Sequence, residues 1–160
     1  MRHTALLLLA LAGAAPALAL AQAHEAVFPV EPVGKGARWE VRRSIEQEGV
    51  ILRAVTLFEV IEIREPLITL KAVIQGGVEA GEVKFEGEPE GQKTEIIQMK
   101  LAGTGEQMVD LGKISPVRSK VSISMENKFK VHAGEKWMDI QQTLKLEKTI
   151  EQVIPKEAPQ

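Results

Sequence analysis

The stretch VRSKVSISMENKFKV, from Val117 to Val131, decides the fold because its residues alternate between apolar and polar. Apolar residues take the odd-numbered positions, with only Ser119 and Asn127 as exceptions. A period of two over this length is typical of a β-strand with one face in a core and the other in water. We therefore predict an antiparallel strand whose Val121, Ile123 and Phe129 face the core. The even-numbered positions are all polar: Arg118, Lys120, Ser122, Ser124, Glu126, Lys128 and Lys130.

Three further segments, 39–45, 68–74 and 138–146, alternate in the same way, though less cleanly. Val50 to Ile63 differs, because apolar residues occupy both parities, with Arg53, Glu59 and Glu62 as exceptions. Helix is the alternative for this segment. Its β-branched residues and Phe58 favour a strand instead, covered on both faces.

Turn signals separate these segments. They are Glu48-Gly49, Arg64-Glu65-Pro66, Gly76-Gly77, Gly87 to Gly91, Gly103-Thr104-Gly105, Ile114-Ser115-Pro116 and Ala133-Gly134. Regular strands with turns between them predict an all-β antiparallel meander of about seven to nine strands. A sandwich, a closed barrel and a strongly curved open sheet all satisfy this pattern, and the sequence does not choose among them.

The amino-terminal segment predicts export. Arg2 and His3 precede an apolar run, and small residues follow at alternate positions up to Ala23, as in a secretory signal peptide. The apolar run is too short for a membrane-spanning helix and contains a proline, so we interpret it as a signal peptide. We expect no transmembrane segment in the chain after its removal. We divide the chain into a signal peptide (1–23), a proline- and glycine-rich lead-in (24–36), a single β domain (37–152) and a loose tail (153–160). The expected location is periplasmic or extracellular.

Composition excludes several classes of protein. The 160 residues carry a net charge of −2 and include no cysteine. A sequence pI near 6.0 argues against nucleic acid as a partner. Without cysteine there is no disulfide framework, thiolate nucleophile or cysteine zinc site.

No constellation of catalytic residues stands out. After removal of the signal only His24 and His132 remain, so a three-histidine zinc site is impossible. No serine lies in a nucleophile elbow, and no phosphate-binding glycine loop is present. Glu86, Glu88 and Glu90 are interpreted as a solvated acidic loop, and His132 as an ordinary exposed histidine in a turn. We assign no catalytic, metal or cofactor-binding residue and expect a protein that is not an enzyme. The ligand-binding residues are unknown at this stage.

Three weaker patterns remain. Cleavage before His24 or Gln22 would leave a histidine near the new amino terminus, an arrangement that can chelate Cu(II) or Ni(II). We take chance as the default for this histidine, and the sequence does not decide whether His24 binds copper. Both tryptophans follow the pattern V-x-x-G-x-(R/K)-W, at Val33–Trp39 and Val131–Trp137. We interpret them as packing residues at two turn-to-strand junctions rather than as the walls of a ligand cleft.

The third weak pattern is a basic ridge on one strand, made of Arg118, Lys120, Lys128 and Lys130. It would meet anionic lipid or polysaccharide, or pair with glutamates across strands, and we favour cross-strand pairing.

The mature chain resembles the uncharacterised exported β-sheet proteins of bacteria. The matching stretches are the P-V-G-x-G-x-R-W entry at Pro32–Trp39, the G-T-G-x-x-x-x-D-L run at Gly103–Leu111, and Pro116 before the long strand. It is more distantly similar to the half-barrel lipoprotein carriers and small lipid-binding barrels of the bacterial envelope. It departs from them in length and in having no recognisable lid helix.

Two functions follow as expectations. The first is a non-enzymatic structural or interaction domain of the cell envelope, with an unknown protein as partner. The second is a periplasmic carrier that binds a lipid or another apolar ligand within a curved sheet. The carrier requires an apolar face that no second sheet fills. The sequence ranks the interaction domain first, because sandwiches, which fill that face, are common.

Overall fold

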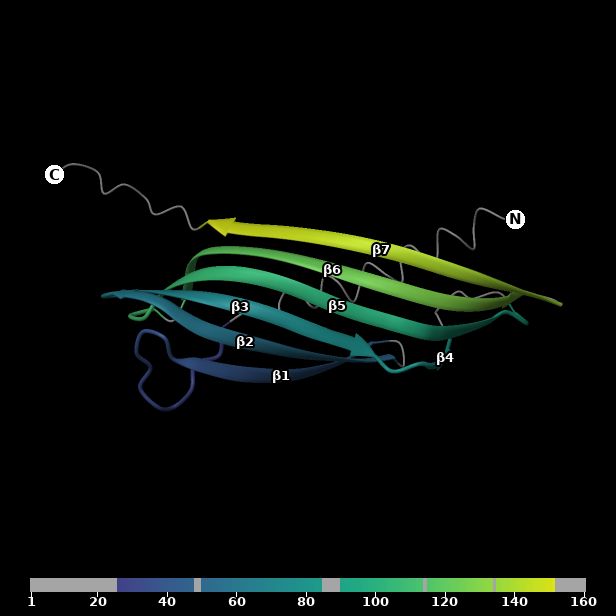
Figure 1. Cartoon of the computed structure of the whole chain (residues 1–160), viewed down its shortest axis with the longest axis horizontal. Coiled ribbons are helices and arrows are strands. Elements are labelled where there is room, and N and C mark those ends of the chain that lie inside the picture. Colours follow the sequence, from purple (N-terminus) through teal and green to yellow (C-terminus); the bar gives the residue numbers. More distant parts are fainter. Residues whose placement is uncertain (1–25, 48–49, 85–89, 114, 134, 152–160) are drawn as a thin grey trace.

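The computed structural model describes residues 26–47, 50–84, 90–113, 115–133 and 135–151. These residues form no helix and fold into one antiparallel sheet (Figure 1). Its strands are β1 (Arg38–Gln47), β2 (Val50–Arg64), β3 (Leu67–Val78), β4 (Gly81–Val83), β5 (Lys93–Asp110), β6 (Ser115–Ala133) and β7 (Lys136–Glu151). The strand order is β1-β2-β3-β5-β6-β7, and the short β4 pairs with β5. The predicted all-β meander is confirmed.

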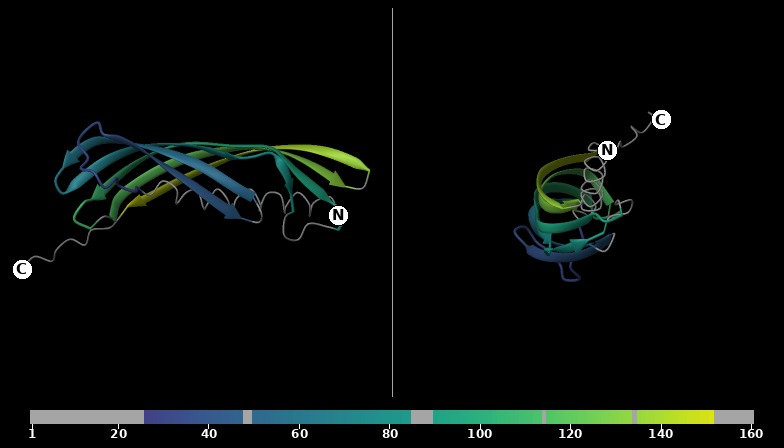
Figure 2. Two further views of the ribbon diagram at one scale, coloured as in Figure 1. Left: turned by 90° about the horizontal axis from the view of Figure 1, so that it is seen from below. Right: turned by 90° about the vertical axis from the view of Figure 1, so that its right-hand side faces the viewer.

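The sheet is not closed. Among the described strands, β1 pairs only with β2 and β7 pairs only with β6. Seen end-on, the sheet curls into a trough whose two rims are β1 and β7 (Figure 2). Of the three forms left open by the sequence, the closed barrel is therefore excluded for the described chain.

Strand β6 lies where the alternation places it. The side chains predicted to face the core are buried, and Ile123 is only 2% exposed. In register, Ile123 lies between Gly103 of β5 and Leu146 of β7. Lys120 and Lys128 lie on the opposite, exposed face. The odd-numbered residues of β6 thus belong to the inner face of the trough.

Strand β2 confirms the strand predicted at Val50 to Ile63, but the prediction that both its faces are covered is wrong. Leu52 and Phe58 are buried on the inner face, whereas Ile51, Leu57 and Ile61 are exposed. A one-layer sheet buries only its inner side, so apolar residues of the other parity remain in water.

Two of the predicted glycine turns are wrong. Gly76-Gly77 lies within β3, and Gly103-Thr104-Gly105 lies in the middle of β5. At Gly103 a Cβ atom would stand 2.9 Å from the carbonyl oxygen of Ser122. At Gly76 it would meet the backbone of β2, 3.0 Å from the Cα of Ala54. These glycines therefore permit a close approach of neighbouring strands, as strongly curved sheets require.

The turn at Arg64-Glu65-Pro66 is confirmed, since it joins β2 to β3 and contains a cis Glu65–Pro66 peptide bond. The turns predicted around Gly49, Ile114 and Gly134 fall wholly or partly outside the described residues. The predicted signal peptide (1–23), His24 and the tail (153–160) also lie outside them. No helix long and apolar enough to cross a membrane occurs in the described ranges.

Candidate functional site

The inner face of the trough is mainly apolar. Its buried polar side chains are Thr56, Thr94, Gln107, Ser119 and Asn127, and Arg43 of β1 and Lys148 of β7 lie in register with buried residues of this face. Its largest cluster extends over β2, β3, β5 and β6 and contains Leu52, Ala54, Ile74, Ile96, Met99, Leu101, Val121, Ile123, Met125, Phe129 and Val131. The partly buried residues that pack against this cluster come from the strands of the sheet itself, for example Ile45 of β1 and Leu146 of β7. The described part of the chain therefore supplies no second layer over this cluster.

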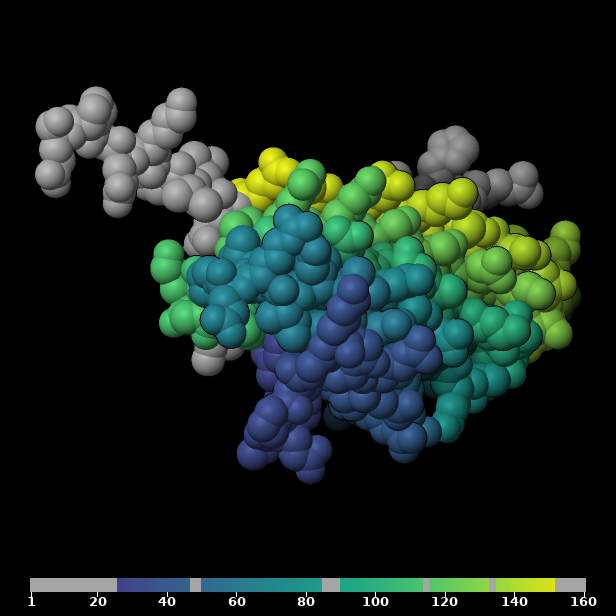
Figure 3. All heavy atoms as spheres, turned by 60° about the vertical axis from the view of Figure 1, so that its left-hand side comes forward, coloured from purple at the N-terminus to yellow at the C-terminus, as the bar shows by residue number. Residues whose placement is uncertain are grey.

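The described part of the lead-in packs over the end of the trough that lies away from the largest cluster. A smaller cluster there includes Phe58 and Leu70, and Phe28 and Val33 of the lead-in pack against it. The ring of Trp39 lies 5.8 Å from that of Phe28 and 5.5 Å from that of Phe58. The lead-in projects from the sheet near β1 in the space-filling view (Figure 3). One end of the trough thus has a built-in cover.

Hydrogen bonds hold the lead-in against the sheet. Trp39 donates a hydrogen bond from its Nε1 to the carbonyl oxygen of Val27 at 2.7 Å. The amide of Gly36 (φ +82°) donates to the carbonyl oxygen of Val60, and the amide of Val60 donates to Ala37. These bonds hold the lead-in where β2 has its bulge, between Val60 and Glu62.

Polar side chains interrupt the apolar face at two places on β6. Ser119 lies directly opposite Gln107 of β5, and Asn127 lies between Met99 of β5 and Gln142 of β7. Ser119, Gln107 and Asn127 are all buried. Four of their atoms have no hydrogen-bond partner within the described chain. These are Oγ of Ser119, Oε1 of Gln107, and Nδ2 and Oδ1 of Asn127. Each such orphaned group costs on the order of 1–3 kcal/mol, so these positions are unusual in a pure packing face.

The inner face of the trough is only partly covered along β7. Ile140, Leu144 and Leu146 point to the inner face but are only half-buried, whereas their neighbours on β6 are buried. A strand at the free rim has a sheet neighbour on one side only, which explains the difference. The apolar surface therefore continues to an accessible edge.

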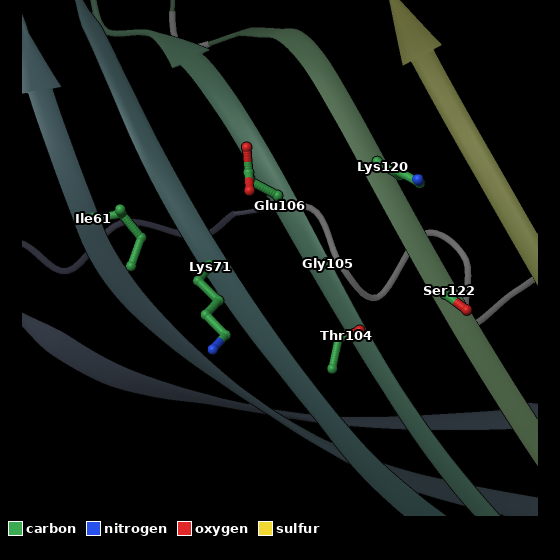
Figure 4. Close-up of a pocket in the computed structure, with 7 residues that line it drawn as sticks. All are labelled: Ile61, Lys71, Thr104, Gly105, Glu106, Lys120 and Ser122. Atoms are coloured by element: carbon green, nitrogen blue, oxygen red, sulfur yellow. The ribbon is translucent and has the colours of Figure 1, made fainter.

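The outer face carries a hollow of about 450 Å³ over the middle of the sheet (Figure 4). Its lining is mixed and comprises Ile61, Lys71, Thr104, Gly105, Glu106, Lys120 and Ser122. Lys71, Glu106 and Lys120 are cross-strand neighbours on β3, β5 and β6, and all three are exposed. The two hydroxyl side chains of the lining, Ser122 and Thr104, have no histidine beside them in this lining.

The basic ridge predicted on β6 is broken up by its neighbours. Arg118 forms an ion pair with Glu151 of β7 at 3.1 Å, and Lys120 faces Glu106 of β5. Lys130 lies over the ring of Trp137, 5.6 Å from its centre. Cross-strand pairing, the favoured interpretation, is thus confirmed for Arg118.

The two tryptophans differ in environment. Trp39 packs between aromatic rings, as predicted, whereas Trp137 is 51% exposed on β7. The prediction of an exposed turn histidine at His132 is wrong. His132 belongs to β6 and is half-buried, with its ring centre 4.5 Å from that of Trp137. A β-strand pair brings these rings together because His132 and Trp137 are cross-strand partners.

No group of three metal-ligating side chains occurs among the residues with described positions. Of the acidic loop, Glu86 and Glu88 lie outside those positions, and Glu90 is exposed. Comparison with protein-family models, curated proteins and solved structures found no match. The candidate site is therefore argued from geometry alone, and it is the inner face of the trough.

Proposed function

We propose that this protein is an exported carrier that holds an apolar ligand, such as an acyl lipid, in the trough of its curved sheet. The observation that carries the proposal is a one-layer sheet whose inner face is apolar across β2, β3, β5 and β6. No second sheet packs against that face within the described chain. A single layer with one apolar face is what a carrier requires, and a sequence pattern cannot distinguish it from a filled sandwich.

The energetics favour a bound cover. Burial of one large aliphatic or aromatic side chain is worth roughly 1.5–3 kcal/mol, and Ile140, Leu144 and Leu146 on the inner face of β7 are only half-buried. A ligand that lies in the trough against β7 would bury the exposed part of these side chains.

The test is native mass spectrometry of the protein purified from its own host, followed by extraction with organic solvent. The proposal expects one apolar molecule bound per chain and enhanced fluorescence of added diphenylhexatriene. The intact mass should also show loss of residues 1–21 or 1–23 if the protein is exported. Material with no bound lipid that also ignores diphenylhexatriene and phospholipid would refute the carrier.

A matched pair of variants locates the site. Leu144 and Thr143 are adjacent on β7, but Leu144 points to the inner face and Thr143 is exposed on the outer face. Leu144→Glu places a charge in the trough and should weaken probe binding roughly tenfold or more, whereas Thr143→Glu makes the same charge change and should leave it unaltered. Equal effects of the two substitutions would contradict binding on the inner face.

A protein partner is the second candidate. The free edge of β7 exposes Trp137 and Met138, and large exposed side chains beside an unpaired strand edge favour docking of another strand. Partner capture from envelope extracts with wild-type protein and Trp137→Ala would test this function. Retention of the same proteins by both would argue against this edge as the docking surface.

A further inference from the structure

We propose that Asn127 and Gln142 form a polar subsite within the trough, which takes one uncharged hydrogen-bonding group of an otherwise apolar ligand. The group would be an ester, an amide or a hydroxyl. The inference rests on the proposed function and deepens it by naming the ligand class, a neutral acyl lipid.

The surroundings of Asn127 carry the argument. Its exposed fraction is 0%, and its neighbours along β6 on the same face are Met125 and Phe129, both buried. Across β5 it faces Met99. Neither its Nδ2 nor its Oδ1 has a hydrogen-bond partner in the described part of the chain. A primary amide in this setting leaves two donors and an acceptor aimed into an apolar trough.

Gln142 completes the pair. It is the cross-strand partner of Asn127 on β7, points to the inner face, and is half-buried at the open rim. Directly opposite residues have Cβ atoms about 4.5–5.5 Å apart, so two amides at these positions reach the same ligand group. The longer side chain of Gln142 lies at the accessible edge, where it can adjust to the ligand that enters.

The chemistry of the subsite selects a neutral group. Two amides offer both donors and acceptors, which match an ester carbonyl, a hydroxyl or another amide. The side chains beside Asn127, namely Met99, Met125, Phe129 and Gln142, carry no charge to balance a buried carboxylate. A plain hydrocarbon would bury Asn127 unpaired, so it should bind more weakly than the same chain with one polar group.

Gln107 and Ser119 form a second polar pair in the trough, distant from Asn127 and Gln142. Ser119 and Asn127 are eight positions apart on β6, which corresponds to about 26 Å at roughly 3.3 Å per residue. A ligand with one polar group therefore cannot form hydrogen bonds with both polar pairs at once. Ser119→Ala is therefore a control that alters an equally buried polar residue on the same strand.

The experiment compares hexadecanamide with hexadecane, both delivered from cyclodextrin, as competitors for bound diphenylhexatriene. With the mature protein, exported with its own leader, hexadecanamide should displace the probe at roughly tenfold lower concentration than hexadecane. Asn127→Leu should abolish this difference, with each competitor measured relative to the affinity of the variant for the probe. Gln142→Leu, at a half-buried position that tolerates change, should reduce the difference, and Ser119→Ala should preserve it.

Thermal unfolding gives an independent reading. Asn127→Leu replaces an unpaired amide with an apolar side chain of similar outline, so ligand-free protein should be as stable as the wild type or more stable. A structural role for Asn127 predicts a loss of stability instead. Failure of the wild type to bind diphenylhexatriene or hexadecanamide would refute the carrier and the subsite together. Probe binding with equal competition by both ligands, or loss of the preference in Ser119→Ala alone, would overturn the subsite and leave the carrier standing.

Discussion

Substitution of Gly103 by alanine tests whether glycines permit the close packing of β5 and β6. A Cβ at this position would lie 2.9 Å from the carbonyl oxygen of Ser122 and 3.0 Å from Cγ1 of Ile123. The carbonyl belongs to the backbone of β6 and cannot rotate away, so the strands must separate. Overpacking of this kind costs about 1–3 kcal/mol, against about 0.5–1 kcal/mol gained when alanine replaces glycine in a strand. The net expectation for Gly103→Ala is a loss of about 1 kcal/mol, and at most about 2.5 kcal/mol.

Two other glycines provide a graded series. At Gly105 the nearest atom to a new Cβ is the carbonyl oxygen of Lys120 at 3.3 Å, and at Gly81 nothing lies within 4 Å. Gly105→Ala should therefore be close to neutral, and Gly81→Ala should gain a few tenths of a kcal/mol. Equilibrium unfolding in urea, followed by far-ultraviolet circular dichroism, gives the free energy of unfolding for all three variants. A Gly103→Ala protein as stable as Gly81→Ala would refute the close approach of β5 and β6.

Three further outcomes are expected. Ile123→Lys should destabilise by several kcal/mol, because it loses about 2–3 kcal/mol of burial and also buries a charge, whereas Lys120→Gln on the outer face should change the urea midpoint little. Acrylamide should quench the fluorescence of Trp137 and leave that of Trp39 largely protected, so Trp137→Phe should remove most of the quenchable signal; equal quenching of both would contradict the packing of the lead-in. Saturation with a tightly bound acyl amide at about 100 times its dissociation constant should add about 2.7 kcal/mol to the free energy of unfolding, and a midpoint independent of ligand concentration would speak against specific binding.

The strands could be predicted from the sequence because alternation is a local property. In β6 the polarity of each residue indicates the face of the sheet on which its side chain lies. Val121, Ile123 and Phe129 are buried, as the pattern indicates. Curvature is not local. A glycine pair in a turn and a glycine pair such as Gly76-Gly77 inside a strand are alike in a single sequence, and only the approach of β2 shows which one is present. The turn predictions failed for that reason.

The candidate subsite had one visible signal, which was the break in alternation at Asn127. Its partner on β5, Met99, could not be found in the same way, because the pairing of β5 with β6 depends on two bulges. Bulges between Ile96 and Gln98 and between Met108 and Val109 set the pairing of β5 with β6. A shift of one residue would turn every side chain of a strand to the other face. Gln142 is different, because β6 and β7 pair without a bulge from Ala133↔Lys136 to Arg118↔Glu151, so a tight hairpin at the predicted turn places it opposite Asn127.

The unpaired buried polar groups of the described chain lie on the inner face, which supports the binding site that we propose there. In the described chain, every buried side-chain polar atom without a partner belongs to Gln107, Ser119 or Asn127, and all three face the trough. On the outer face, charged residues such as Arg38 and Glu59 pair across strands at 3.0 Å. Proteins tend to break local rules where function demands it, at a cost in stability. Unpaired polar groups on a buried face are costly as structural elements, and in the carrier that we propose part of this cost is recovered when the ligand bonds to Asn127.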